Sequence, residues 1–211
     1  MGNSPVPLLA VLISGRGSNL QALIDATRDG ALDATIAVVI SNRADAQGLE
    51  RARAAGIETL VIPHRDYPSR DDYDRALVEQ LEGRRVTLIC LAGFMRVLGP
   101  TFCRAFPNGI VNIHPSLLPA FPGADAQQQA FDHGVRVSGA TVHLVTPELD
   151  AGPIVAQVAV PVRDDDTAES LAARILAVEH RLYPGAICRL LKGGWRVEGR
   201  RVVFDEPEPV R

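Results

Sequence analysis

Short apolar runs and helical patterns alternate along the first half of the chain. Five runs rich in branched residues predict strands, at Leu8–Ile13, Thr35–Ile40, Thr59–Ile62, Val86–Leu91 and Gly109–Ile113. Between these runs, the residue pattern predicts helices over Ser18–Thr27, Ala44–Ala55 and Arg70–Leu81. Strands without alternating polar residues are typical of a parallel sheet that is covered on both faces. The pattern therefore predicts an α/β fold with a doubly wound, mostly parallel, Rossmann-like sheet.

The second half of the chain has a different pattern. Val137–Val145 and Ile154–Val160 look like strands with no helix between them, which predicts a mixed or antiparallel C-terminal part. Thr167 is a plausible N-cap for a long helix over Ala168–Leu191, which has to accommodate Pro184.

No repeat, low-complexity tract or linker divides the sequence. We therefore expect one domain over residues 1–211, which closes with a short hairpin and a mobile tail at roughly 204–211.

Composition narrows the class of protein. The chain has 211 residues, a formal net charge of −3 and 5% aromatic residues, which argues against nucleic acid as a partner. No run approaches the roughly 20 apolar residues that span a bilayer, and the first residues lack the basic start of a signal peptide. The cysteines Cys90, Cys103 and Cys188 are far apart and odd in number, so we expect free thiols and a cytoplasmic location.

A glycine-rich turn follows the first predicted strand, at Ser14-Gly15-Arg16-Gly17-Ser18-Asn19. Such a turn before a helix exposes backbone N–H groups and makes a natural phosphate cradle. The alternative is ordinary helix capping by Ser18 or Asn19. The turn is a poor dinucleotide fingerprint, because Leu20 replaces the third glycine and no acidic residue follows the second strand.

Two polar residues interrupt the fifth apolar run. Asn112 and His114 are two positions apart, so both side chains project to the same face at the carboxyl end of a predicted parallel strand. The alternative is a buried histidine that bonds to a backbone carbonyl, but a polar pair in an apolar strand favours function. We also expect a cis peptide bond at Pro115 or Pro119.

The local sequence does not decide the roles of Asp150 and Arg70, and it argues against a metal site. Asp150 lies in a Gly/Pro loop, where aspartate usually serves turn chemistry, and nothing in the sequence places it near His114. Arg70 can bind an anion or pair with a nearby aspartate. The five histidines lack zinc-ligand spacing, so we predict no metal site.

Taken in order, four motifs resemble the phosphoribosylglycinamide formyltransferase family over nearly the whole chain to about Leu191: Val11–Asp25, Leu91–Leu98, Asn112–Pro119 and Glu148–Pro153. The resemblance implies an enzyme of de novo purine synthesis. It would transfer the formyl group of 10-formyltetrahydrofolate, its co-substrate, to the primary amine of 5-phosphoribosylglycinamide by direct attack in a ternary complex. Its partners would be small molecules, and it would be a monomer or homodimer.

The resemblance also implies roles for single residues. The catalytic residues would be Asn112, His114 and Asp150, with Asp150 raising the pKa of a protonated His114. The ribonucleotide would be bound by Gly17, Ser18, Asn19 and Glu179. The folate would be bound by Arg70, Met95, Arg96, Val97, Leu98 and Asn112.

One residue departs from the family pattern, because Asp125 stands where a histidine is expected after Pro-Gly. Its role and the order of the Leu118–Gln129 loop are not readable from the sequence.

Three other functions compete with the transferase. A 10-formyltetrahydrofolate hydrolase would share the catalytic trio but use water as acceptor. An NADP-dependent oxidoreductase is suggested by Gly15-Arg16-Gly17 and Arg43, and opposed by Leu20. A non-catalytic folate- or nucleotide-binding module is opposed by the intact trio. In the families that this chain resembles, the enzymes that act on initiator tRNA and the hydrolases each carry an added domain. We expect this chain to be too short to contain one.

Overall fold

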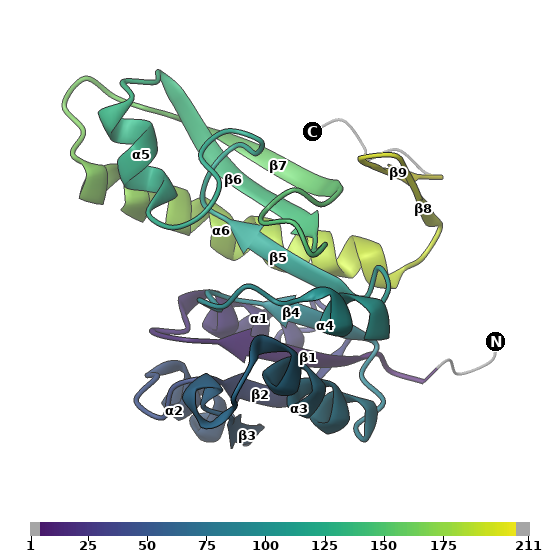
Figure 1. Ribbon diagram of the computed structural model, residues 1–211. Helices are drawn as coiled ribbons and strands as arrows, with labels where there is room; N and C mark the ends of the chain where they lie inside the picture. Colours follow the sequence, from purple (N-terminus) through teal and green to yellow (C-terminus); the bar gives the residue numbers. More distant parts are fainter. Residues whose placement is uncertain (1–4, 206–211) are drawn as a thin grey trace.

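A single nine-stranded sheet forms the centre of the computed structural model, which describes residues 5–205 (Figure 1). The strand order is β3-β2-β1-β4-β5-β6-β7-β9-β8. The parallel part contains β1 (Leu8–Ile13), β2 (Thr35–Ser41), β3 (Glu58–Val61), β4 (Leu88–Leu91) and β5 (Ile110–His114). The remaining strands are β6 (Val137–Leu144) and β7 (Ile154–Pro161), both antiparallel to their predecessor, and the hairpin β8 (Trp195–Glu198) and β9 (Arg201–Phe204). The predicted fold class is confirmed.

Helices cover both faces of the sheet (Figure 1). One face carries α1 (Ser18–Arg28), α2 (Gly48–Ala54) and the long α6 (Ala168–Leu191). The other carries α3 (Arg70–Glu82) and α4 (Pro100–Ala105). Helix α5 (Ala126–Asp132) packs against α6, and a single 3₁₀ turn lies at His64–Asp66.

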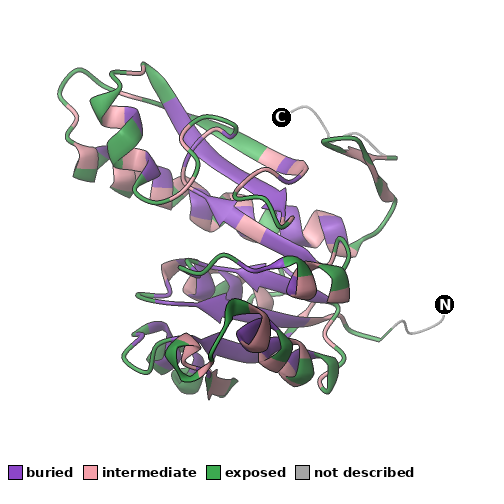
Figure 2. Cartoon of the chain, viewed as in Figure 1, coloured by how far each residue is buried: buried purple, intermediate pink, exposed green. Residues whose placement is uncertain are grey.

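The first strand shows why both faces need a cover. Leu9, Val11 and Ile13 belong to the apolar cluster under α1, α2 and α6, whereas Ala10 and Leu12 belong to the cluster under α3 and α4. All five side chains are fully buried, and Figure 2 shows the same burial along the central strands. An uninterrupted apolar strand therefore serves two cores at once.

Local capping and loop geometry agree with several sequence predictions. Helix α6 has the predicted bounds, continues through Pro184, and begins with a capping box in which Thr167 and Ser170 bond reciprocally. The Leu118–Pro119 peptide bond is cis. Helix α2 begins at Gly48, four residues later than predicted, and the short helices α4 and α5 were not predicted.

The structure describes the first residues of the predicted C-terminal tail. Phe204 closes β9, and the backbone N–H of Asp205 donates to the carbonyl of Gly194. The rest of the tail that was predicted to be mobile lies outside the described residues. Within residues 5–205, no helix is long and apolar enough to cross a membrane.

Candidate active site

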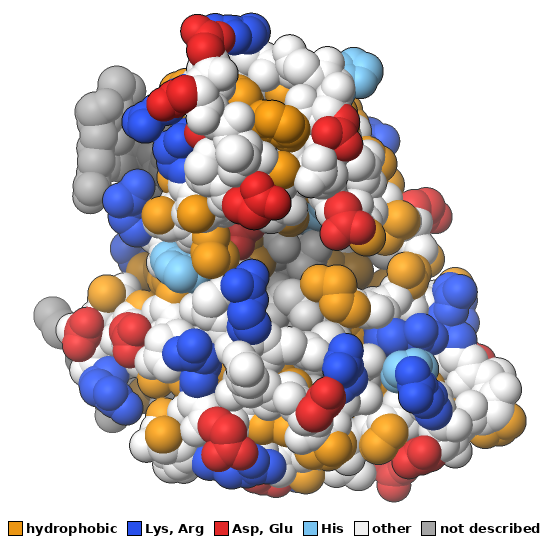
Figure 3. Space-filling view, turned by 90° about the vertical axis from the view of Figure 1, so that its left-hand side faces the viewer, with side chains coloured by type: hydrophobic (Ala, Val, Ile, Leu, Met, Phe, Trp, Pro, Cys, Tyr) orange, Lys and Arg blue, Asp and Glu red, His pale blue; other side chains and the backbone are white. Residues whose placement is uncertain are grey.

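The carboxyl ends of β1, β4 and β5 open on one edge of the sheet. The chain turns to opposite sides of β1 to form β2 and β4, so a crevice is expected between β1 and β4, where α/β sheets bind ligands. Figure 3 looks onto this side of the molecule, where the surface is hollowed between two lobes. Acidic side chains border the upper lobe, and Lys or Arg side chains border the lower one.

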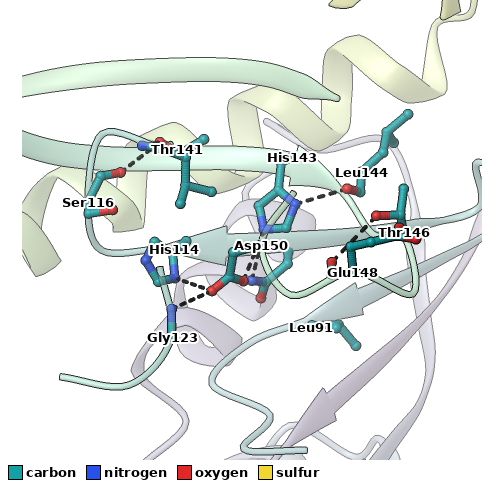
Figure 4. A network of polar contacts seen from close by, with 12 residues as sticks. Leu91, His114, Ser116, Gly123, Thr141, His143, Leu144, Thr146, Glu148 and Asp150 are labelled. Carbon is teal, nitrogen blue, oxygen red and sulfur yellow. Dashed lines mark hydrogen bonds and ion pairs between the residues drawn. The ribbon is translucent and has the colours of Figure 1, made fainter. Parts of the chain in front are cut away.

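Asp150 lies against His114, a proximity that local sequence reasoning could not establish. The Nδ1 atom of His114 is 3.5 Å from Oδ2 of Asp150, and both side chains are nearly buried. In Figure 4, Asp150 points between two imidazoles, those of His114 and His143. The loop that carries Asp150 is also a turn, since its backbone is left-handed with φ of 48°, so both interpretations of this residue hold.

The loop after β5 folds back onto the same group. The backbone N–H of Gly123 donates to Oδ2 of Asp150 at 2.8 Å, and Nε2 of His114 lies 2.9 Å from the carbonyl of Phe121. A carbonyl only accepts, so Nε2 carries the proton of a neutral His114 ring and Nδ1 faces Asp150 with a lone pair. The structural alternative for His114, a bond to a backbone carbonyl, is therefore present together with the contact to Asp150.

His143 is a site residue that the sequence reasoning missed. It stands opposite Asn112 in the pairing of β5 with β6, and it is buried. Its Nδ1 lies 2.9 Å from the carbonyl of Leu144, so Nε2 faces Nδ2 of Asn112 at 3.2 Å and Oδ1 of Asp150 at 3.6 Å. The available signal was a histidine between Val142 and Leu144. It is weaker than the polar pair Asn112 and His114, because this strand also contains Ser138 and Thr141.

Asp150 raises the pKa of His114, as expected, but the net shift of that pKa is downward. Burial lowers the pKa of His114 more than the Phe121 carbonyl and the Asp150 carboxylate raise it. Burial alone would raise the pKa of Asp150, but the nearby imidazole of His143, the bond from the Gly123 amide and the imidazole of His114 hold it below its ordinary value. The directions of these shifts favour a neutral His114 beside an ionised Asp150 in the free protein, whereas the resemblance implies a protonated His114 in the reaction.

Burial also lowers the pKa of His180 in α6, whose Nε2 is buried without a hydrogen-bond partner in the described chain. For His114 and His180 alike, the unfolded chain binds a proton near pH 6.5 while the folded chain resists it until a lower pH. The free energy of unfolding is therefore expected to fall as the pH drops through about 6.5. Urea unfolding at about pH 7.5 and 5.5 measures the difference.

The variant His180→Gln should reduce this pH dependence, and the exposed His133→Gln should leave it unchanged. An equal loss of stability in wild type and His180→Gln would contradict the assignment.

The glycine-rich turn has its N–H groups available. The carbonyls of Gly15 and Arg16 accept bonds from the Gly48 amide and the Arg51 guanidinium, which turns them toward α2. Gly17 is left-handed, and a Cβ on it would lie 2.6 Å from Cα of Gly48, so the turn needs glycine there.

The helix-capping alternative for this turn is wrong. The N-cap of α1 is Gly17, with no side-chain cap from Ser18 or Asn19. Within the described chain, the backbone N–H groups of Gly17, Ser18 and Asn19 donate to no protein group.

Asn19 and Glu179, 160 positions apart, meet beside the turn. Nδ2 of Asn19 donates to Oε2 of Glu179 at 2.7 Å, and both side chains are buried. Burial raises the pKa of Glu179, which the bond from Asn19 offsets only in part. The Oδ1 atom of Asn19 is buried without a partner in the described residues, which leaves one acceptor for a ligand.

The predicted folate residues gather after β4 and at the start of α3. Met95 is 71% exposed and Val97 is 43% exposed, whereas Leu98 is buried. Arg96 is exposed as well. Apolar side chains that are exposed in this way beside a crevice suit an aromatic ligand.

Arg70 begins α3 beside this segment, since a Cβ on Gly99 would lie 3.3 Å from its Cδ. The nearby carboxylates of Asp71 and Asp72 pair with Arg75 instead.

Asp125 does not join the cluster around Asp150. It is the exposed N-cap of α5, with φ of 54° and no side-chain cap bond. Within residues 5–205, no group of three His, Cys, Asp or Glu side chains is arranged to hold a metal ion.

Comparisons with known proteins point to one family. The model of the formyl transferase family matches residues 8–187. The chain is 44% identical to the phosphoribosylglycinamide formyltransferase of Escherichia coli (strain K12), over 91% of this chain and 88% of that protein. It is 52% identical to the trifunctional purine biosynthetic protein adenosine-3 of Drosophila melanogaster over 88% of this chain, but spans only 14% of that protein's length.

Solved structures agree. Glycinamide ribonucleotide transformylase 1 from Symbiobacterium toebii has a TM-score of 0.93 at 54% identity, covering 95% of each chain. A formyltetrahydrofolate deformylase from Pseudomonas syringae has a TM-score of 0.88 at 27% identity, covering 96% of this chain and 67% of that one. The chain belongs to the formyl transferase family, among the phosphoribosylglycinamide formyltransferases.

Proposed function

We propose that this chain transfers the formyl group of 10-formyltetrahydrofolate to the primary amine of 5-phosphoribosylglycinamide, in de novo purine synthesis. The observation that carries the proposal is the largely buried cluster of Asn112, His114, His143 and Asp150, whose side chains contact one another. Proteins so named are similar to it along nearly its whole length.

The ribonucleotide is placed by the turn after β1. Its phosphate accepts hydrogen bonds from the free amides of Gly17, Ser18 and Asn19 at the positive end of α1. Glu179 accepts a hydrogen bond from the same ligand directly, or it acts on the ligand indirectly by orienting Asn19, which donates to it. The folate lies along Met95–Leu98, with its pterin against the backbone and the apolar side chains, and Arg70 meets a carboxylate of the folate.

The reaction joins the amine nitrogen to the formyl carbon and breaks the bond from that carbon to the folate nitrogen. Attack gives a tetrahedral species with an alkoxide and an ammonium. Asn112 donates to the alkoxide through Nδ2. The Nε2–H of His114 donates to it when the alkoxide replaces the Phe121 carbonyl as its acceptor, and such donors are typically worth ~3 kcal/mol each. No covalent enzyme intermediate is required, because holding both substrates together removes much of the entropic barrier.

The ammonium proton has a ready acceptor. The lone pair of Nδ1 on neutral His114 and the ionised Asp150 face each other across 3.5 Å. A proton taken there is shared by the pair, and it can pass to the folate nitrogen as that nitrogen leaves. His143 fixes the orientation of Asn112 and Asp150 from the neighbouring strand.

The expectations on setting and partners belong to the same proposal. The chain works as one formyltransferase domain in the cytoplasm, with three cysteines free. It acts on small molecules, as a monomer or homodimer. We further propose that Asp125, whose role the sequence left open and which is exposed at the N-terminus of α5, is not required for the chemistry.

The hydrolase is the second candidate function, since it would use the same trio with water as acceptor. Release of tetrahydrofolate from 10-formyltetrahydrofolate, with and without the ribonucleotide, separates the two. Release that requires the ribonucleotide supports the transferase, whereas equal release without it indicates the hydrolase. No release in either mixture would leave an oxidoreductase or a non-catalytic binding module.

A further inference from the structure

The segment that follows β4 is held at both of its ends by buried side chains from other elements. The backbone N–H of Met95 donates to Oγ of Ser14 at 2.8 Å. The backbone N–H of Gly99 donates to Oδ2 of Asp74 at 2.8 Å. Ser14 directly follows β1 and begins the glycine-rich turn, whereas Asp74 lies in α3. Between the two anchors, residues 95–98 have no regular secondary structure, so these contacts largely set their path.

Burial of the Asp74 carboxyl costs free energy that packing alone does not explain. It is 1% exposed, and its Oδ1 has no hydrogen-bond partner in the described residues. Burial raises the pKa of its carboxyl more than the bond from Gly99 lowers it. A buried carboxyl without full hydrogen bonding costs free energy, so a purely structural position would be better filled by an apolar residue.

The carboxyl of Asp74 caps a helix that cannot cap itself. Helix α4 has Gly99 at its N-cap with no side-chain cap, and Pro100 at its first position. Asp74 therefore satisfies an amide at this helix end from a different element. One turn earlier in α3, Asp71 accepts from the hydroxyl of Thr101, which ties the same two helices together.

Gly99 is required by this contact and not by its backbone. Its φ of −88° is open to any residue, but a Cβ there would lie 2.6 Å from Oδ2 of Asp74. The same Cβ would lie 3.3 Å from Cδ of Arg70. Arg70 and Asp74 are four positions apart in α3, so both side chains lie on the same face of the helix. That face therefore carries both the residue that anchors Gly99 and the predicted folate arginine.

We propose that Asp74 is a positioning residue for the folate site, which fixes Met95–Leu98 relative to Arg70 so that the co-substrate meets a preset surface. This inference rests on the proposed function. Ser14 holds the other end of the segment, and it also belongs to the turn that would bind the ribonucleotide. A change at Asp74 therefore affects the folate alone, whereas a change at Ser14 affects both substrates.

The test compares Asp74→Ala with Asp74→Asn. Asp74→Ala should raise the KM for 10-formyltetrahydrofolate about tenfold, which equals about 1.4 kcal/mol, and leave the KM for the ribonucleotide within about twofold. Asp74→Asn keeps an acceptor for the Gly99 amide and should stay within about twofold of wild type for both. Tyr73→Phe is the matched control, because the Tyr73 hydroxyl is buried and has no partner in the described chain.

Calorimetric binding of tetrahydrofolate gives a readout that does not depend on turnover, and Asp74→Ala should weaken it by the same factor. Gly99→Ala provides an independent variant, which should show the same selective loss. The double variant should lose less than the sum of the single changes, since removal of the carboxyl makes room for the new Cβ.

Equal loss for both substrates, or unchanged tetrahydrofolate binding in Asp74→Ala and Gly99→Ala, would overturn the positioning role. A wild-type chain that transfers no formyl group would instead overturn the proposed function.

Discussion

Replacement of His114 or Asp150 by alanine is expected to lower the kcat for formyl transfer by roughly a thousandfold. The two side chains are nearly buried and face each other at 3.5 Å, where an acceptor for the ammonium proton and a donor to the alkoxide act on the transition state. The ribonucleotide should still bind within about twofold of wild type, because its proposed contacts lie at the turn after β1.

Steady-state kinetics and ribonucleotide binding on the same preparations check this expectation. Asp150→Asn is the sharper variant, since it keeps an acceptor for the Gly123 amide while removing the charge. His133→Ala, at an exposed position on the loop side of α5, serves as the control and should retain full turnover. Near-wild-type kcat in His114→Ala or Asp150→Ala would refute the catalytic assignment.

Gly152→Ala is expected to disrupt both the fold and the site. A Cβ at Gly152 would lie 1.8 Å from the carbonyl oxygen of Leu144 and 2.9 Å from its carbon, so the backbone itself must move. That carbonyl oxygen also accepts from Nδ1 of His143, and Asp150 is only two residues away. The change should lower the free energy of unfolding by about 2–4 kcal/mol and reduce kcat as strongly as a change at Asp150.

Urea unfolding and the transfer assay together measure this effect. The matched control is Gly185→Ala in α6, where a Cβ meets nothing within 4 Å. Alanine there should stabilise the protein by up to ~1 kcal/mol, because glycine is a poor helix former. Wild-type stability and kcat in Gly152→Ala would show that the close approach to Leu144 is not needed.

Elements with strong local signals were predictable from the sequence. Strand β1 and helix α6 have the predicted bounds, because one is an uninterrupted apolar run and the other begins at a residue that caps helices well. The missed helices lack such signals. Helix α4 buries only Phe102, and the buried residues of α5 are two alanines, Ala126 and Ala130. Neither presents an apolar stripe to detect.

Without the family resemblance, the catalytic cluster was predictable only in β5, where a polar pair broke an apolar pattern. Asn112 and His114 stand out in their strand, and the neutral state of His114 could not be foreseen because burial is a property of the fold. The place of Asp150 depends on the antiparallel return of β6 and β7, which puts distant residues side by side. Asp74 gives no local signal, since an acidic residue near the start of a helix is ordinary.

Direct transfer from folate to amine is tested most directly by the fate of the formyl oxygen. The reaction is run in water enriched in ¹⁸O, with 10-formyltetrahydrofolate and the ribonucleotide, and the mass of the product is measured by mass spectrometry. Direct attack by the amine keeps the original oxygen, so the formylated ribonucleotide should carry no ¹⁸O and no labelled formate should appear. Labelled formate, or ¹⁸O in the product, would show that water attacks the formyl carbon and would contradict the transferase mechanism.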